Sequence, residues 1–184
     1  MRMALICLDP GHGGIDTGCR AGEIVEKNIV LPICLRVREL LEPRGHTVIL
    51  TRESDDTVSL EERCRIANRA GVDLFMSVHA DWWSHSGASG PAAFYFQKGQ
   101  FFSSEGRRLA ACVYEEVVGV YPDVPRRGVK PARYYVLGGT VMPAALIELG
   151  FVTNAHDLDL LLRYDLMACV LAMGIVRYLR GWLC

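Results

Sequence analysis

The stretch SLEERCRIANRAGVDLFMSVHA, residues 59–80, places a capped helix directly before a buried strand. Ser59 and Glu62 have the spacing of a capping box, which predicts a helix over about 60–70. Gly71 is the residue type that commonly ends a helix. The apolar run that follows is short, as expected of a strand buried on both faces. A helix that leads into such a strand is typical of α/β proteins with a parallel sheet.

The same alternation extends over most of the chain. Strands are expected at 3–8, 46–51, 73–80 and 92–97, and in the runs RYYVL (133–137) and PAALIEL (143–149). Helices are expected within 28–45, at about 60–70 and 104–119, and as a short and a long segment over 153–183, the first capped near Asn154. No repeat or linker divides the chain. We predict a single-domain, three-layer α/β sandwich over residues 1–184, with a mostly parallel, twisted sheet of about six strands and helices on both faces.

The composition excludes several classes of protein. The net charge is −1, and the scattered arginines are interpreted as solvated surface residues, so we expect no nucleic-acid partner. Because no run reaches 18 uncharged apolar residues, we expect no membrane span. The seven cysteines include no CxxC pair, which argues against a disulfide framework or a four-cysteine zinc site and suits a reducing compartment. The oligomeric state stays open, with a monomer favoured.

Polar residues follow the predicted strands where each strand ends. Asp9 and His12 follow the first strand, His79 stands at the end of the third, and Glu148 stands at the end of the last. Glu26 precedes the first helix, which packs back from the same edge. Ligands of open α/β sheets bind beyond the carboxyl ends of the strands. We therefore expect two histidines and two glutamates to converge there.

These residue types suit a hydrolytic zinc site. Zinc accepts histidine nitrogen and carboxylate oxygen, and catalytic sites keep three protein ligands and one open position for water. His12, Glu26 and His79 supply the ligand types. Glu148 lies inside the apolar run AALIELGF, where an unpaired carboxylate costs several kcal/mol, and it stands where a general base is needed.

Each residue taken alone has a structural alternative. His79 could be an ordinary hydrogen-bonded histidine, Glu26 a solvated carboxylate at a helix start, and Glu148 the partner of an arginine. The glycines around His12 in DPGHGG also raise the alternative of a phosphate-binding loop. GHGGIDTG lacks the GxGxxG order, because Asp16 takes the third glycine's place, and it lacks a GK[ST] ending. No helix begins directly after it, so the metal-site interpretation is preferred.

The motifs DPGHGGIDTG, EKNIVL, TRESDDTVSLEERCRIAN, DLFMSVHAD and MPAALIELGFVTN occur in this order. Together they closely resemble the zinc-dependent N-acetylmuramoyl-L-alanine amidases of the family known as amidase 3, over roughly residues 4–180. The resemblance implies hydrolysis of the amide between N-acetylmuramic acid and the first L-alanine of peptidoglycan. It also implies one zinc ion held by His12, Glu26 and His79, with Glu148 as the catalytic carboxylate. Asp9 is a candidate for fixing a ligand histidine, and a turn residue before Pro10 is the alternative.

The chain departs from the family pattern in two places. After YYVL, where similar sequences often carry an arginine, it has Gly138 and Gly139. If that arginine holds the stem peptide, binding shifts to other cations of the preceding loop, and the candidates are Arg127, Lys130 and Arg133. The alternative is that the loop is simply solvated. Trp82 and Trp83 could stack on sugar or peptide, or pack under their own loop.

The biological setting stays open between a phage lysin, a sporulation or germination enzyme, and a fragment of an autolysin. The sequence shows no wall-binding repeat and no secretory leader, so we expect cytoplasmic synthesis with release through a holin-type pore, or a shortened chain. The enzyme would act on the cell wall. Two other functions are kept as alternatives: a zinc peptidase that cuts within the stem peptide, and a non-catalytic wall-binding relative.

Overall fold

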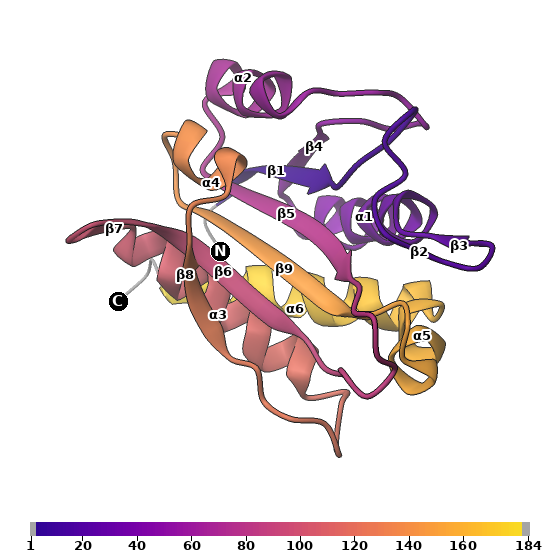
Figure 1. Cartoon of the computed structure of the whole chain (residues 1–184). Coiled ribbons are helices and arrows are strands. Elements are labelled where there is room, and N and C mark those ends of the chain that lie inside the picture. The colour runs from indigo at the N-terminus through magenta and orange to yellow at the C-terminus, as the bar shows by residue number, and fades with distance from the viewer. Residues whose placement is uncertain (1–2, 182–184) are drawn as a thin grey trace.

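The computed structural model describes residues 3–181, and its largest element is a seven-stranded sheet (Figure 1). The strands follow the order β4-β1-β5-β9-β6-β7, with β8 beside β6. Their bounds are β1 Leu5–Pro10, β4 Thr47–Leu50, β5 Leu74–Asp81, β6 Ala92–Lys98, β7 Phe101–Phe102, β8 Val129–Ala132 and β9 Ala144–Phe151. A separate small hairpin pairs β2 (Arg20–Ala21) with β3 (Ile24–Val25).

The centre of the sheet is parallel and one end is mixed. Strands β4, β1, β5 and β9 run parallel to one another. β6 lies antiparallel to β9, while β8 is parallel and β7 antiparallel to β6. The prediction of a mostly parallel sheet is confirmed, with seven strands in place of about six.

Helices cover both faces of the sheet, as predicted, but they do so unequally (Figure 1). Helices α1 (Lys27–Leu41), α3 (Ser104–Val118) and α6 (Tyr164–Arg180) form a continuous layer on one face. The other face carries α2 (Leu60–Ala70) and the short α4 (Tyr135–Gly139). The remaining helical segments are the 3₁₀ turn Glu42–Arg44 and α5 (Ala155–Leu161). The predicted end of the last helix, and Cys184, lie outside the described residues.

Local signals explain where two of these helices begin. Ser59 Oγ accepts a hydrogen bond of 3.1 Å from Glu62 N, and Gly71 ends α2 in the left-handed conformation, as the capping box predicts. The Asn154 side chain caps α5 by accepting from the backbone of His156 and Asp157. These caps fix the residues at which the two helices begin.

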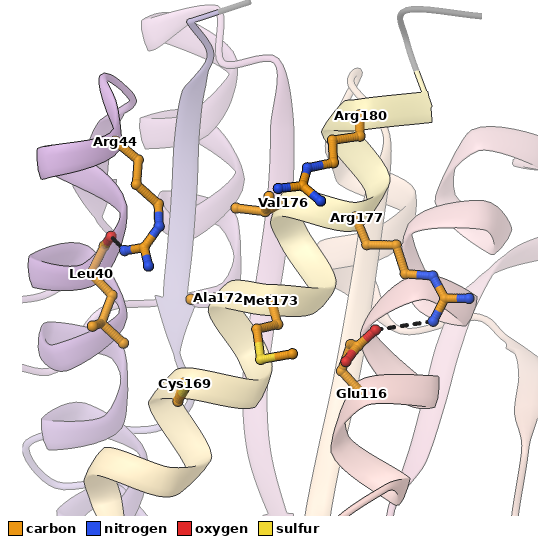
Figure 2. Close-up of a pocket in the computed structure, with 9 residues that line it drawn as sticks. All are labelled: Leu40, Arg44, Glu116, Cys169, Ala172, Met173, Val176, Arg177 and Arg180. Atoms are coloured by element: carbon orange, nitrogen blue, oxygen red, sulfur yellow. Dashed lines mark hydrogen bonds and ion pairs between the residues drawn. The ribbon is translucent and has the colours of Figure 1, made fainter. Parts of the chain in front are cut away.

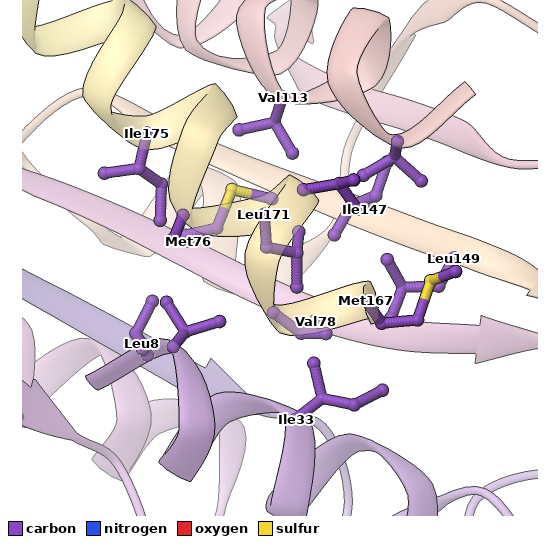
Figure 3. Close-up of a cluster of buried hydrophobic side chains, with 14 of the residues drawn as sticks. Leu8, Ile33, Met76, Val78, Val113, Ile147, Leu149, Met167, Leu171 and Ile175 are labelled. Carbon is purple, nitrogen blue, oxygen red and sulfur yellow. The ribbon is translucent and has the colours of Figure 1, made fainter. Parts of the chain in front are cut away.

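The main core lies between the sheet and the three-helix layer (Figure 3). Leu8, Met76 and Ile147, from three neighbouring strands, are at most 1% exposed. They pack in one cluster with Ile33 of α1 and Leu171 of α6. Each such side chain contributes roughly 1.5–3 kcal/mol by its removal from water. This apolar layer stabilises the sheet, whose other face carries the polar residues described below.

The prediction of a strand over 133–137 is wrong. Tyr135–Gly139 forms α4, in which Val136 and Leu137 are the buried residues. Two strands of the sheet were not predicted: the two-residue β7, and β8, which lies in a segment interpreted as a loop because it contains Pro131. β8 pairs only with β6, and such an edge position tolerates proline. Runs of four or five residues are too short for their periodicity to separate a strand from a helical turn.

Two compositional expectations can be compared with the structure. The six cysteines within residues 3–181 are all free thiols. In the same range, no helix has the length and apolar character needed to cross a membrane.

Candidate metal centre and active site

The candidate residues share the more open face of the sheet. His79 of β5 and Glu148 of β9 are register partners, and Asp9 of β1 is the partner of Ser77. Successive residues of a strand point to opposite faces, so the intervening Val78 and Ile147 point to the three-helix core. The sheet therefore places His79 and Glu148 side by side, as the rule for parallel strands predicts.

The three predicted metal ligands meet around one carboxylate. Glu26 Oε2 lies 3.1 Å from His12 Nε2, and Glu26 Oε1 lies 2.9 Å from His79 Nδ1. One donor atom from each residue falls within 4.8 Å of the others. Two imidazoles and one carboxylate form the donor set of many catalytic zinc sites, so these residues fit a zinc ion.

Two glycines make room for this cluster. A Cβ atom on Gly11 would lie 2.3 Å from Cε1 of His79, and one on Gly18 would lie 2.5 Å from Oε2 of Glu26. Both distances are far below van der Waals contact. The glycines of the first loop therefore let its backbone approach the ligand side chains, which explains the histidine embedded in DPGHGG.

Backbone amides hold the central carboxylate in place. Glu26 is 3% exposed, and it accepts hydrogen bonds of 2.9 Å from Cys19 N and 3.1 Å from Ala80 N. Burial raises the pKa of Glu26, but its hydrogen bonds to His12 and His79 outweigh burial and keep the pKa well below the ordinary value. Burial in turn lowers the pKa of His79, but the hydrogen bond to Glu26 and the negative charges around the ring together outweigh burial and raise the pKa to about 9. The site is therefore built around a fixed negative charge that suits a cation.

Two buried arginines support the unusual backbone of the first loop. His12 has a φ of 60°, in the left-handed region that residues other than glycine rarely adopt. Arg63 donates to the carbonyls of Pro10 and His12 at 2.8 and 2.5 Å, and Arg52 donates to the Gly11 carbonyl at 2.9 Å. Each arginine is only 3% exposed, so the interpretation of the arginines as solvated surface residues is wrong for these two.

Asp9 lies beneath this loop and does not contact a ligand ring. Its carboxylate accepts from Thr51 and Ser77 at 2.6 Å and from Arg63 at 2.7 Å. Burial raises the pKa of Asp9, but the Arg63 guanidinium and these hydrogen bonds outweigh burial and lower it. Asp9 belongs to strand β1, so the alternative of a turn residue is wrong as well, and its link to His12 passes through Arg63.

The carboxylate that does contact a ligand ring is Asp16, which the sequence reasoning missed. Asp16 Oδ2 lies 2.8 Å from His12 Nδ1, on the far side of the ring from Glu26. A carboxylate in this position fixes the orientation and tautomer of a metal-binding histidine. Its only sequence signal was an acidic residue four positions after His12 in the same glycine-rich loop.

Glu148 is an unpaired carboxylate at the edge of a hollow. Its Oε2 is buried and has no hydrogen-bond partner, and burial raises its pKa to about 7. The hollow measures about 500 Å³, and Glu148, His79 and His12 line it together with Leu60 and Tyr134. A carboxylate whose pKa lies near neutral pH, and which stands next to a metal-binding cluster, can accept and return a proton.

Comparison with known proteins assigns this arrangement to a family. Residues 6–175 match the family model described as N-acetylmuramoyl-L-alanine amidase. The chain belongs to this family. It is 30% identical over 191 residues to the germination-specific N-acetylmuramoyl-L-alanine amidase of Bacillus subtilis, an alignment that spans 95% of this chain and 79% of the relative. The endolysin of Bacillus phage SPP1 is 38% identical over 161 residues, which cover 85% of this chain and 58% of the endolysin.

Solved structures of the amidase family have the same fold. The amidase AmiC2 of Nostoc punctiforme superposes with a TM-score of 0.88 at 35% identity, covering 96% of this chain and 97% of that one. The CwlD amidase of Clostridioides difficile, solved in complex with the GerS lipoprotein, gives 0.88 at 32% identity, with coverages of 97% and 99%. Both the sheet topology and these superpositions thus confirm the predicted fold class.

The predicted substrate-binding cations lie apart from the hollow. Arg127 donates to Asp81 at 2.7 Å and to the Gly90 carbonyl at 3.1 Å, and its guanidinium lies 4.4 Å from the centre of the Phe151 ring. Lys130 and Arg133 are exposed on and after the edge strand β8. The hollow is also lined by apolar and aromatic residues that sequence reasoning did not single out: Ile15, Val58, Leu60, Tyr134, Tyr135, Val136 and Leu146.

A second hollow lies on the opposite side of the sheet, between α1, α3 and α6 (Figure 2). It measures about 420 Å³, and its walls are mainly apolar, including Cys169 and Met173. At its rim, Arg177 pairs with Glu116 at 3.0 Å. No cluster of metal-ligating side chains faces this hollow within residues 3–181. The candidate metal ligands His12 and His79 line the first hollow instead.

Proposed function

We propose that this chain is a zinc-dependent hydrolase that cleaves the amide bond between N-acetylmuramic acid and L-alanine in peptidoglycan. The observation that carries the proposal is the unpaired carboxylate of Glu148, held in register beside a cluster of two histidines and one glutamate. Membership of the amidase family supplies the substrate class.

His12, Glu26 and His79 would hold the zinc ion. When bound, zinc polarises the scissile carbonyl and provides a position for water. The chain's own contribution is orientation. Asp16 fixes the ring of His12, the Cys19 and Ala80 amides fix Glu26, and the buried arginines fix the loop backbone. A site prepared in this way does not have to reorganise when the substrate arrives.

Glu148 would move the proton that the reaction requires. Its carboxylate takes a proton from the attacking water and then gives it to the alanine nitrogen, which leaves as an amine. Because burial raises its pKa to about 7, the group can both accept and donate a proton near neutral pH. Its position in the apolar run of β9 removes competing hydrogen-bond partners.

Peptidoglycan places the site of action in the cell wall. The chain's relatives include a germination enzyme and a phage endolysin, and we keep both settings for this chain, together with an autolysin. Lys130 and Arg133 stay proposed contacts for carboxylates of the stem peptide, because both cations are exposed. The contacts of Arg127 indicate that its side chain stabilises the end of β5 and the segment after it, and does not bind the stem peptide.

The test is product analysis with purified peptidoglycan. Hydrolysis should yield a new free N-terminal alanine and peptide-free muramic acid, with about one zinc per chain. Glu148→Gln should retain zinc and lower kcat by about 10²- to 10⁴-fold, while the exposed Glu39→Gln serves as the matched control. Cuts within the stem peptide would favour the zinc-peptidase alternative. Full activity of Glu148→Gln, or of metal-free protein, would reject the mechanism.

A further inference from the structure

The loop after β5 carries two tryptophans that the catalytic site does not use. Trp82 and Trp83 follow the metal-ligand strand directly, and their exposed fractions are 45% and 56%. The sequence left open whether they pack under their own loop, and these exposures show that neither tryptophan is buried there. Large exposed aromatic side chains beside an active site are typical of a binding surface.

The backbone of this loop is held at four points. Trp82 N donates to Asp81 at 2.8 Å, and Trp83 N donates to Thr153 at 3.3 Å. Further along, Asn154 donates to the Ser86 carbonyl at 2.7 Å. Gly90 N donates to the buried Asp157 at 2.7 Å. The loop is therefore built onto the segment between β9 and α5, so the tryptophans are presented from a fixed backbone.

The loop has a composition that suits a neutral, hydroxyl-rich ligand. Residues 82–91, WWSHSGASGP, contain no lysine, arginine, aspartate or glutamate. Apart from His85, the segment therefore has no side chain that could attract a charged ligand. Indole faces next to serine hydroxyls match sugar rings, which present a flat face of C–H groups surrounded by hydroxyls.

The position of the loop indicates which part of the substrate it meets. Trp82 and Trp83 are not among the residues lining the hollow, which extends toward the first turn of α2 and Tyr134. Figure 1 shows the loop leaving the opposite end of β5, next to α5 and away from α2 and α4. Trp82 lies three positions after His79 in the chain, a span of about 10 Å when the backbone is extended. If the scissile bond lies at His79 and Glu148, the part of the substrate on one side of the bond would thus lie over the hollow. The part on the other side would lie over the tryptophans.

We propose that Trp82 and Trp83 form a platform that binds the glycan strand of the substrate, while the hollow receives the stem peptide. This inference rests on the proposed amidase activity for its choice of sugar. The scissile amide joins a sugar to a peptide, so a substrate laid across the metal cluster has its sugar on one side and its peptide on the other. The platform would make long glycan strands better substrates than a single muramyl peptide.

The test separates glycan length from chemistry. Wild type and the Trp82→Ala/Trp83→Ala double variant are compared on long peptide-bearing glycan strands and on a single-sugar muramyl pentapeptide. We expect the double variant to raise KM for the long strands by about tenfold, with kcat within about twofold and KM for the single-sugar substrate unchanged. Trp82→Phe/Trp83→Phe should retain most of the wild-type KM, because an aromatic face is kept. Phe101→Ala, which removes a 66% exposed ring on β7, is the matched control.

A binding experiment tests the platform independently of hydrolysis. Peptide-free glycan strands should quench the tryptophan fluorescence of the wild type but not that of the Trp82→Ala/Trp83→Ala variant, which keeps Trp182 as its fluorophore. Quenching without any hydrolysis would reject the amidase activity and keep the platform. Normal hydrolysis with equal KM values in the wild type and the double variant would reject the platform and keep the amidase. An equal rise in KM on both substrates would also overturn the proposal.

Discussion

The two faces of the central sheet are made by the same strands, yet they differ in almost every physical property. On the α1–α3–α6 face, Met76, Val78 and Ile147 are at most 1% exposed and contact other apolar side chains. On the α2–α4 face, the next residues of the same strands are Ser77, His79 and Glu148. Neighbouring residues of one strand therefore belong to different parts of the molecule, one to the apolar core and the next to the candidate site.

The cover on each face follows from this difference. Three long helices close the apolar face, whereas α2 and the five-residue α4 leave the carboxyl ends of β1, β5 and β9 accessible from a hollow of about 500 Å³. The α2–α4 face has a smaller apolar cluster, which includes Phe75 and Leu146, and the site beside it is held by hydrogen bonds that Arg52 and Arg63 donate to backbone carbonyls and to Asp9. Substitutions of the site residues on this face should therefore act on geometry and charge, and those in the three-helix core on packing alone.

The largest effect on metal binding is expected from Gly11→Ala on the polar face. The added Cβ atom would lie 2.3 Å from the His79 ring, so the ring must leave its place in the ligand cluster. We expect zinc affinity to fall by about 10- to 100-fold, as when other supports of a metal ligand are lost, with activity at limiting zinc falling in parallel. Competition with a chromophoric chelator measures the affinity. Gly87→Ala, which meets nothing within 4 Å, is the control, and equal affinity in the two variants would contradict the crowding argument.

A second prediction compares two arginines of α2. Arg63→Ala removes the buried partner of Asp9 and the donor to the His12 carbonyl, so we expect a loss of about 3–5 kcal/mol in the free energy of unfolding. Arg65 pairs with Glu62 at the surface, and Arg65→Ala should cost about 1 kcal/mol or less. Urea unfolding of both variants measures the difference. Similar losses of unfolding free energy in the two variants would mean that burial does not determine how much these ion pairs stabilise the fold.

The sequence predicted the residues whose positions depend on the sheet, together with His12 just beyond the end of β1, but it missed Asp16, whose position depends on the path of the first loop. His79 and Glu148 could be paired because parallel strands end at one edge, and Glu26 because it opens α1 from that edge. The assignment of Asp9 to a ligand ring failed, since His12 turns through a left-handed conformation and meets Asp16 instead. No periodicity encodes such a turn.

The burial of two arginines could not be predicted from the sequence either. Arg52 and Arg63 stand in polar stretches that resemble solvated surface, and only the folded loop brings three carbonyls to them. The strand β8 was missed for a related reason. Its sequence VKPA lacks strand character, and it is held by register pairing with β6, as between Ala93 and Val129. Tertiary contacts there override local preference.

A third prediction concerns acid. The pKa of Asp9 is lower in the folded protein than in the unfolded chain, where it is about 3.9, so its stabilisation is fully present above that pH. It is lost as the pH falls through the lower, folded pKa. We therefore expect the difference in unfolding free energy between the wild type and Asp9→Asn to be large at pH 7 and to shrink below about pH 4. Denaturant unfolding at several pH values measures it, and a difference independent of pH would exclude the charge of Asp9 as its cause.

The smallest effect is expected from Ile147→Val, one residue from Glu148 but on the opposite face. Ile147 is fully buried, so removal of one methyl group should cost about 0.5–1.5 kcal/mol in the free energy of unfolding. Because the side chain points into the α3–α6 core, kcat and KM should stay at wild-type values. Thermal unfolding and steady-state kinetics on the same preparation test both parts. A fall in kcat from this substitution would show that packing behind β9 positions Glu148, and the two faces would then be mechanically coupled.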